Sequence, residues 1–258
     1  MGGVIDMLPE DCVCTIPSFT SPTDTFRSSM VSSTFRSAAE SDFVWERFLP
    51  ADYKDVVSRL DTPLTYTAMK ELFHCLCNPV LIYGGRKSFK LEKLSGKISY
   101  MLSARELSIT WGNDPMYWSW KSIPQSRFSE VAELRTTRWL EIHGKIKTEI
   151  LHQTQNMVSI EVGNKVCNGM AYLRNEDCKK QQMESLFYGN RNEMLRKRVI
   201  EGGERFPSER EDGWMEIELG EFFSGEAYEE VKMSLMEVKG YQLKGGLIIE
   251  GIEVKPKD

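Results

Sequence analysis

The spacing of apolar residues changes along this chain, and that change limits the folds open to it. Up to about residue 76 apolar side chains recur at helical spacing, as in Leu72, Phe73 and Leu76. Beyond about residue 94 they alternate with polar residues, as in Leu140 and Ile142. No helical segments alternate with the expected strands, as a parallel sheet would require. The pattern therefore predicts an α+β chain of more than one domain, a helical segment followed by an antiparallel β-sandwich.

Three short helices are expected within the first 60 residues. Residues 21–24 (SPTD) end one helix and start the next, with Thr23 or Asp24 as the expected N-cap. The expected apolar faces are Phe26, Met30, Val31 and Phe35 in one helix, and Phe43, Val44, Trp45 and Phe48 in the next. A bundle of this size is marginal by itself, so we expect a partner to help stabilise it. A further helix is expected over residues 67–76, and the domain boundary between residues 60 and 94.

The expected strands also include residues 215–219 and 231–235, which alternate in the same way. The last strand, residues 247–254, follows Lys244, Gly245 and Gly246, a tight-turn signal. We therefore expect it to form a hairpin with residues 231–241. Residues 175–210 are polar and charged and predict a long surface excursion, within which residues 190–200 suit a short basic helix.

Composition excludes several classes of function. The formal net charge of -5 gives no general attraction to nucleic acid or to anionic membranes. The chain opens without a basic, apolar leader, and its longest apolar run, around residues 80–83, is far below the roughly 20 residues that span a bilayer. We therefore expect a soluble protein of the cytoplasm or nucleus. Residues 196–198 (RKR) could serve nuclear import, although a solvated loop is the better interpretation.

No catalytic or metal-binding pattern stands out. The three histidines lie in no nucleophile or metalloprotease motif, and no glycine-rich phosphate loop follows a strand. The six cysteines are expected to be reduced thiols. Cys12 with Cys14, and Cys75 with Cys77 beside His74, suggest a zinc site, but both pairs lack the usual spacing of two to four residues between ligands. We expect a non-catalytic protein without metal or cofactor.

Aromatic residues are concentrated in residues 109–120 (ITWGNDPMYWSW), around a Gly-Asn-Asp-Pro turn. Flat apolar faces beside polar turn groups suit stacking on sugars. The other interpretation is that the tryptophans belong to the core, because Trp118 and Trp120 alternate onto the same face of a sheet. By composition alone the core interpretation is favoured, and both stay open.

Residues 8–59 resemble an F-box, through LPED at 8–11, VSSTFR at 31–36 and DFVWERF at 42–48. In that family the module docks on the Skp-type adaptor of a cullin-RING ubiquitin ligase. The resemblance implies that Leu8, Pro9, Val31 and Trp45 hold adaptor-facing or supporting positions. Pro17 replaces the family's usual aliphatic residue. A proline inside a helix costs about 3 kcal/mol, so we expect a kinked or shortened helix and weakened docking.

Residues 94–258 resemble the phloem protein 2 domain, the Nictaba-like lectin domain of plants. Four blocks carry the resemblance: residues 102–111 (LSARELSITW), 117–120 (YWSW), 139–146 (WLEIHGKI) and 212–223 (DGWMEIELGEFF). The order of the two modules resembles plant F-box proteins of the phloem protein 2-B type. The resemblance implies a jelly-roll-like β-sandwich that binds N-acetylglucosamine oligomers or N-glycan cores.

The same resemblance implies the residues of the sugar site. Trp111 and Trp118 match the family's sugar-contacting tryptophans, and Phe222, Phe223 and Glu230 hold positions that complete the site. Around residues 151–159 the chain departs from the family, because about one strand, roughly 5 to 6 residues, and its loop are missing. Loss of a strand exposes neighbouring edges, so we expect a destabilised or rearranged sandwich.

Together these features predict a substrate-receptor subunit of a Skp-cullin-F-box E3 ubiquitin ligase. Residues 1–60 form the F-box domain, residues 61–93 a helical and loop linker, and residues 94–258 the sandwich that selects clients. The expected partners are a Skp-type adaptor, through it a cullin, and a glycoprotein or other protein client. One alternative is an intracellular lectin with a vestigial F-box. Others are a protein-protein recognition module without sugar binding and an unstable variant with neither activity.

Overall fold

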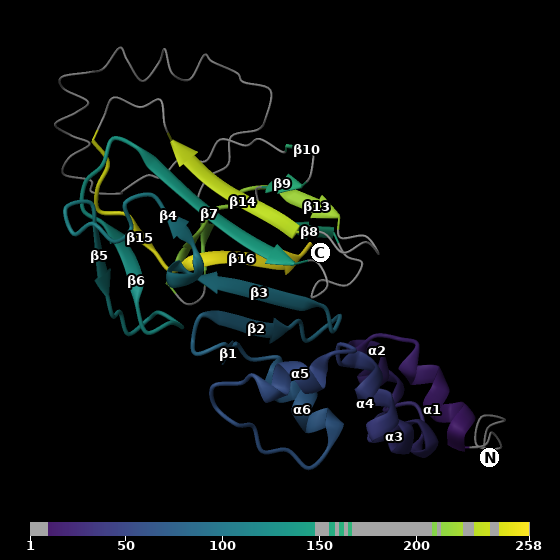
Figure 1. Ribbon diagram of the computed structural model, residues 1–258. Helices are drawn as coiled ribbons and strands as arrows, with labels where there is room; N and C mark the ends of the chain where they lie inside the picture. The colour runs from purple at the N-terminus through teal and green to yellow at the C-terminus, as the bar shows by residue number, and fades with distance from the viewer. Residues whose placement is uncertain are drawn as a thin grey trace.

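The computed structural model describes residues 10–147, 155–157, 160–162, 165–166, 208–210, 213–223, 230–237 and 243–257. Short helices come first and strands follow, as the sequence predicts (Figure 1). The helices are α1 (Glu10–Ser18), α2 (Pro22–Ser28), α3 (Ser33–Ala39), α4 (Asp42–Phe48), α5 (Tyr53–Ser58) and α6 (Met69–Leu76). Helix α6 buries Leu72, Phe73 and Leu76, the face that its apolar spacing predicts.

The start of α2 differs from the prediction. Ser21 is the N-cap, and its hydroxyl oxygen accepts a hydrogen bond from the Asp24 N–H at 3.1 Å. Pro22 occupies the first helical turn, where its fixed φ suits a helix and its missing N–H costs nothing. The prediction of Thr23 or Asp24 as the cap is therefore wrong by two or three residues.

Pro17 lies in the last turn of α1, which ends one residue later. Its carbonyl oxygen accepts hydrogen bonds from the Thr20 N–H at 2.9 Å and from the Thr20 hydroxyl at 2.8 Å. These bonds satisfy the Pro17 carbonyl oxygen, which lies in the last turn of the helix and has no partner within it. The helix accommodates the proline in its last turn, and a kink or shortening caused by Pro17, with weakened docking, stays a prediction.

The apolar stripe predicted for the second helix is divided between α2 and α3, and only Phe35, in α3, packs against a small apolar cluster of α1, α3 and α4. Phe26, Met30 and Val31 are 62%, 65% and 70% exposed, because α2 ends at Ser28 and the chain turns before α3. The next face is correct in part: Val44 and Trp45 are buried, whereas Phe43 is 48% exposed. Helical spacing identified neighbours on a face but not whether a partner element covers that face.

The strands form two larger sheets. The six-stranded sheet has the order β1 (Val80–Ile82), β2 (Lys87–Leu91), β3 (Ile98–Ser103), β16 (Gly251–Pro256), β8 (Gln155–Met157) and β13 (Glu221–Phe223). The five-stranded sheet has the order β10 (Lys165–Val166), β9 (Ile160–Val162), β14 (Glu230–Glu237), β7 (Leu140–Lys147) and β4 (Ser108–Ile109). A three-stranded sheet has the order β15 (Ile248–Ile249), β6 (Val131–Leu134) and β5 (Trp118–Lys121). A two-stranded sheet pairs β11 (Ser208–Glu209) with β12 (Met215–Glu216). Every strand pair among the described residues is antiparallel, as predicted.

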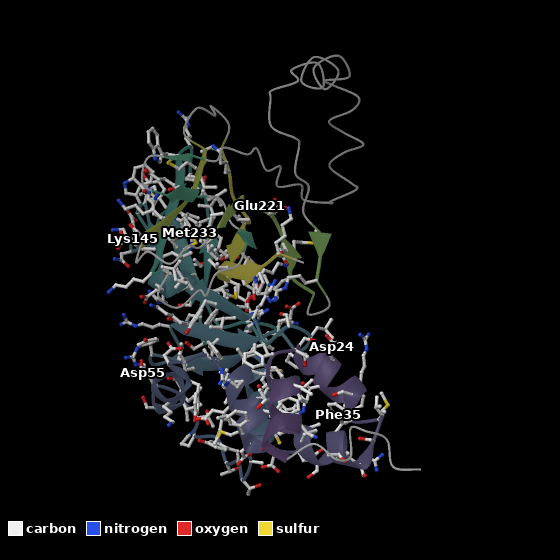
Figure 2. All side chains as sticks on the ribbon, turned by 90° about the vertical axis from the view of Figure 1, so that its right-hand side faces the viewer. Asp24, Phe35, Asp55, Lys145, Glu221 and Met233 are labelled. Atoms are coloured by element: carbon white, nitrogen blue, oxygen red, sulfur yellow. The ribbon has the colours of Figure 1, made fainter. Side chains whose placement is uncertain are left out.

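The two larger sheets pack face to face. At Gly144 of β7, an added Cβ would lie 3.3 Å from Leu102 of β3 and 3.0 Å from Met233 of β14. Burial alternates along β7, so its even-numbered residues face the other sheet and its odd-numbered residues face outward. Lys145 accordingly lies at the edge of the molecule in Figure 2, and Met233 lies inside it.

The predicted terminal hairpin is wrong. β14 pairs along its whole length with β7, whereas β16 pairs with β3 and β8 in the other sheet. Lys244 instead exchanges two backbone hydrogen bonds with Thr137, at 2.8 and 2.9 Å. The stretch 247–254 is two strands rather than one, because the chain leaves β15 at the buried Glu250 before β16 begins. Of residues 215–219, only Met215–Glu216 forms a strand.

One apolar core, which we call the main core, joins the helices to the sheets. It includes Trp45 of α4, Phe73 of α6, Phe89 of β2 and Leu102 of β3. The predicted linker, residues 61–93, thus contains α6 and two strands of the six-stranded sheet; α5 lies beside β1 (Figure 1), and α6 contacts β2. A smaller cluster holds α1, α3 and α4 together through Val13, Cys14, Ala38 and Val44. Helix α4 contributes to both.

Several predictions fall outside the described residues. They are Leu8 and Pro9, the basic helix at 190–200, the patch at 196–198 and most of the excursion at 175–210. Within the stretch predicted to lack a strand, the structure describes only β8; β9 follows it directly and belongs to the other sheet. In the described part of the chain, no helix is long and apolar enough to cross a membrane.

Candidate binding site at the aromatic turn

The turn at residues 110–118, which we call the aromatic turn, presents Trp111 to solvent. Trp111 has φ of 57°, uncommon for a residue with a side chain, and is 47% exposed. Its ring stacks on Tyr117, with ring centroids 4.9 Å apart and planes inclined by 27°. The two rings together form an accessible aromatic platform.

Two further tryptophans hold the backbone on either side of Trp111. The Trp118 indole N–H donates to the Thr110 carbonyl oxygen at 3.1 Å, and the Trp120 indole N–H donates to the Gly112 carbonyl oxygen at 3.0 Å. Both bonds satisfy indole donors that would otherwise be costly to bury. The two indole hydrogen bonds therefore hold the backbone of Trp111 in its strained conformation, with the side chain exposed.

The rest of the turn is held as firmly. The Asp114 carboxylate accepts a hydrogen bond from the Met116 N–H at 2.8 Å, and its carbonyl oxygen accepts one from the Tyr117 N–H at 3.0 Å. Arg135 donates its backbone N–H to the Tyr117 carbonyl oxygen at 2.8 Å. Tyr117 is thus anchored to the strand region that follows β6, which keeps the platform in place.

A polar network lies on the outer face of the five-stranded sheet, beside the aromatic turn. Glu141 of β7 accepts hydrogen bonds from the Trp139 indole N–H at 2.8 Å and the Thr110 hydroxyl at 3.3 Å, and its other carboxylate oxygen lies 2.9 Å from His143 Nε2. His143 Nδ1 lies 2.9 Å from the Ser234 hydroxyl of β14. The hydrogen bond from Trp139, and then those from His143 and Thr110, lower the pKa of Glu141.

The structure brings together only some of the predicted sugar-contacting residues. Trp111 and Trp118 are neighbours, but Trp118 is 3% exposed, so its role is to support the turn. Phe222 is buried in β13 of the other sheet, and the side chain of Phe223 lies outside what the structure describes. Glu230 is exposed and lies 3.5 Å from the Lys145 ammonium group.

Glu230 is also far along the sheet from Trp111. Thr110, next to Trp111, donates its backbone N–H to the Glu141 carbonyl oxygen at 3.0 Å, whereas Glu230 pairs with Lys147. Six residues of strand separate Glu141 from Lys147, a distance of about 20 Å. The aromatic turn and Glu230 therefore belong to opposite ends of β7.

Sequence reasoning missed Tyr117 as the stacking partner and Trp139 as an exposed indole. Trp139 is 43% exposed. A signal for it did exist: Trp139 precedes an alternating strand and shares the parity of Glu141 and His143, which face outward. No comparable signal marks Tyr117, because its contact with Trp111 depends on the shape of the turn.

The helical segment has a separate candidate surface. Ile16, Phe19, Phe26, Met30 and Val31 are 47%, 75%, 62%, 65% and 70% exposed, and we call them the helical apolar surface. They come from α1, α2 and the turn after α2. Exposed apolar side chains gathered on one small module are typical of a protein-binding surface.

Trp45, predicted at an adaptor-facing or supporting position, is buried. It is 4% exposed, donates its indole N–H to the Ala39 carbonyl oxygen at 2.6 Å, and lies 5.2 Å from the ring of Phe73. Val31 faces solvent. Trp45 therefore anchors α4 to the main core, and Val31 is available to a partner.

Comparison with known proteins agrees with both resemblances. Residues 97–256 match the family model described as Phloem protein 2, and residues 5–47 match the model described as F-box domain. The chain is 52% identical to "F-box protein PP2-B15" of Arabidopsis thaliana over 97% of this chain and 96% of the relative. It is 50% identical to "F-box protein VBF" of the same organism, over 97% of this chain and 99% of the relative.

The alignment with "F-box protein PP2-B15" also bears on the predicted deletion. It spans 279 positions, more than the 258 residues of this chain, so the relative carries residues that this chain lacks. That those residues include the strand expected near residues 151–159 stays a prediction.

Proposed function

Because this chain belongs to the phloem protein 2 family and carries an F-box domain, we propose that it is a substrate receptor of a Skp-cullin-F-box ubiquitin ligase. The helical segment docks the Skp-type adaptor and through it a cullin, and the sandwich selects the client. The work of the protein is recognition, and it takes place in the cytoplasm or nucleus, where those partners act.

The observation that carries the proposal is the helical apolar surface. Its five side chains are 47% to 75% exposed on a module whose own cluster is small, so burial against a partner removes apolar surface from water. Each fully buried side chain of this kind contributes about 1.5–3 kcal/mol. Helix α1 packs against α3 and α4 through the smaller cluster, and Trp45 packs α4 against Phe73 in the main core, so the helices that carry the surface are held in place.

The adaptor proposal is tested by co-purification of the full chain with a Skp-type adaptor. Val31→Asp or Phe26→Asp should reduce capture at least tenfold, because a buried, unpaired carboxylate is costly. Leu243→Asp is the matched control, since Leu243 is 67% exposed but lies in the sandwich part of the chain. If Val31→Asp and Phe26→Asp both bind the adaptor as the unaltered protein does, the proposal is refuted. A lectin with a vestigial F-box would then be the better account.

We propose further that the sandwich binds N-acetylglucosamine oligomers or N-glycans through the aromatic platform of Trp111 and Tyr117. Stacked, exposed rings held by a rigid turn suit the C–H face of a sugar, and the turn supplies polar groups beside them. Trp118 acts as a positioning residue. Glu230 and Phe222 lie elsewhere, so the platform alone carries this proposal.

The sugar proposal is tested by calorimetric titration of the full chain with chitin-derived oligomers. Trp111→Ala should abolish measurable binding, whereas Met116→Ala should not, because Met116 is 67% exposed in the same turn but is not part of the platform. A folded protein that binds no sugar in any such titration would favour recognition of a protein client instead.

A further inference from the structure

Trp139 is an exposed indole whose orientation is fixed. Its side chain is directed onto the outer face of the five-stranded sheet by the hydrogen bond from its N–H to Glu141, at 2.8 Å. At 43% exposure the ring keeps a large apolar surface in contact with water. An exposed tryptophan free to rotate would lose conformational entropy on binding, and this one has already lost part of it.

Glu141 is held in turn by one residue of the aromatic turn and by a neighbour on its own strand, β7. Thr110 donates from the aromatic turn, and His143, which contacts Ser234 of β14, lies against the second carboxylate oxygen. An ionised carboxylate has about four acceptor positions, and three contacts are made here. Glu141 therefore orients Trp139 and can still accept one hydrogen bond from a bound molecule.

The same Thr110–Glu141 pair links Trp139 to Trp111. Thr110 donates its backbone N–H to the Glu141 carbonyl oxygen at 3.0 Å, so the two strands are adjacent at this point. Trp111 follows Thr110 in the aromatic turn, and Trp139 lies two residues before Glu141, just ahead of β7. Because Ile109 pairs antiparallel with Ile142, the chain after Thr110 and the chain before Glu141 lie toward the same end of the sheet, so one and two residues separate the two tryptophans from the Thr110–Glu141 contact.

We propose that Trp139 and Glu141 form a second subsite for an oligosaccharide whose first unit occupies the platform of Trp111 and Tyr117. This inference rests on the proposed sugar binding of that platform. The indole stacks on the C–H face of a further sugar unit, and Glu141 accepts a hydrogen bond from one of its hydroxyl or amide groups. A single sugar reaches one platform only, so the arrangement selects extended chains over short ones.

The chemistry of the cluster favours a sugar over an apolar peptide. An apolar segment laid across Trp139 would cover Glu141 and Thr110, and their polar groups would lose contact with water. A sugar unit instead offers hydroxyl groups in the plane of its ring and an apolar face above it. The Trp139 ring matches the apolar face of the sugar, and the Glu141 carboxylate matches its hydroxyl groups.

The test is titration of the full chain with chitin-derived oligomers of increasing length, for the unaltered protein, Trp139→Ala, Trp139→Phe, Trp111→Ala and Leu243→Ala. Circular dichroism and thermal unfolding establish that each variant is folded. Trp139→Ala should weaken binding of long oligomers about tenfold and leave binding of the shortest unchanged. Trp139→Phe should retain part of the gain with length, and Leu243→Ala should match the unaltered protein.

Each outcome decides the matter. If Trp111→Ala abolishes binding while Trp139→Ala binds every length as the unaltered protein does, the second subsite is refuted and the proposed sugar site stands. If Trp139→Ala weakens all lengths equally, Trp139 belongs to a single site and the second subsite is again refuted. If the folded, unaltered protein binds no oligomer, both the sugar site and its extension fail.

Discussion

Phe73→Ala should destabilise the helices and the sandwich together. Phe73 is fully buried in the main core, where its ring centroid lies 5.2 Å from that of Trp45 and 6.4 Å from that of Phe48. An added Cβ at Gly96, in the turn between β2 and β3, would lie 3.7 Å from its ring. The side chain therefore packs against α4 and lies beside the turn that joins β2 and β3 of the six-stranded sheet.

Removal of a buried phenylalanine ring costs about 3–5 kcal/mol, as lost transfer free energy and as a cavity. We expect the upper half of that range. The neighbours Leu72 and Leu76 are fully buried, and Trp45 is fixed by its hydrogen bond to Ala39, so the site has little freedom to collapse. Against a total stability of about 5–15 kcal/mol, the loss is a large fraction.

The measurement is denaturant unfolding of the full chain, combined with hydrogen exchange read separately for α4, β3 and β7. We expect one shared transition that moves to lower denaturant, with all three segments losing protection in parallel. Phe26→Ala is the matched control, since this phenylalanine is 62% exposed, and its effect should stay within about 0.5 kcal/mol. Loss of protection in α4 while β3 and β7 remain unchanged would refute the shared core.

Three further predictions concern the sandwich. Trp118→Phe removes the hydrogen-bond donor to Thr110 but keeps a buried ring, so it should lower the free energy of unfolding by about 1–3 kcal/mol, measured by thermal unfolding. It should also weaken sugar binding, although Trp118 itself does not contact the sugar. Gly251→Ala would place a Cβ 2.0 Å from the Leu102 carbonyl oxygen and should prevent the pairing of β16 with β3. Gly213→Ala meets no atom within 4 Å of its Cβ and should cost only about 1 kcal/mol of stability, because its φ is 82°. The soluble yield and the midpoint of thermal unfolding are compared for the two variants. The pKa of Glu141 is lowered from 4.5 in the folded protein, so the ionised carboxylate stabilises the fold above pH 4.5, and this contribution is lost as the pH falls through the folded pKa. Glu141→Gln should therefore reduce the loss of stability at acid pH. Identical curves of stability against pH for the two proteins would contradict this.

The pattern of the sequence by itself determined which faces of several elements are buried. The alternation of β7 and the apolar face of α6 appear in the structure as predicted. These features depend on neighbours two to four residues apart, so the period of the pattern identifies them. The two module resemblances were equally readable, because their motifs are contiguous blocks, and the family models match both regions.

Choices between distant segments depended on the tertiary structure. The turn at residues 244–246 suggested a hairpin, but β14 forms eight paired positions with β7, and β16 pairs with β3 across the sandwich. Ladder length and burial on both sheets outweigh a local turn preference. The helical stripe likewise identified Phe26 and Val31 as neighbours, yet no element of the described chain covers them.

The candidate site shows the same division. The sequence concentrated aromatic residues in one turn and left open whether they bind or pack, and the structure assigns them different roles. Trp118 is buried and holds the turn, while Trp111 and Trp139 are exposed near the contact between Thr110 of the aromatic turn and Glu141 of β7. Composition specifies that aromatic surface is available, but exposure depends on which strand lies alongside, and only the folded chain decides that.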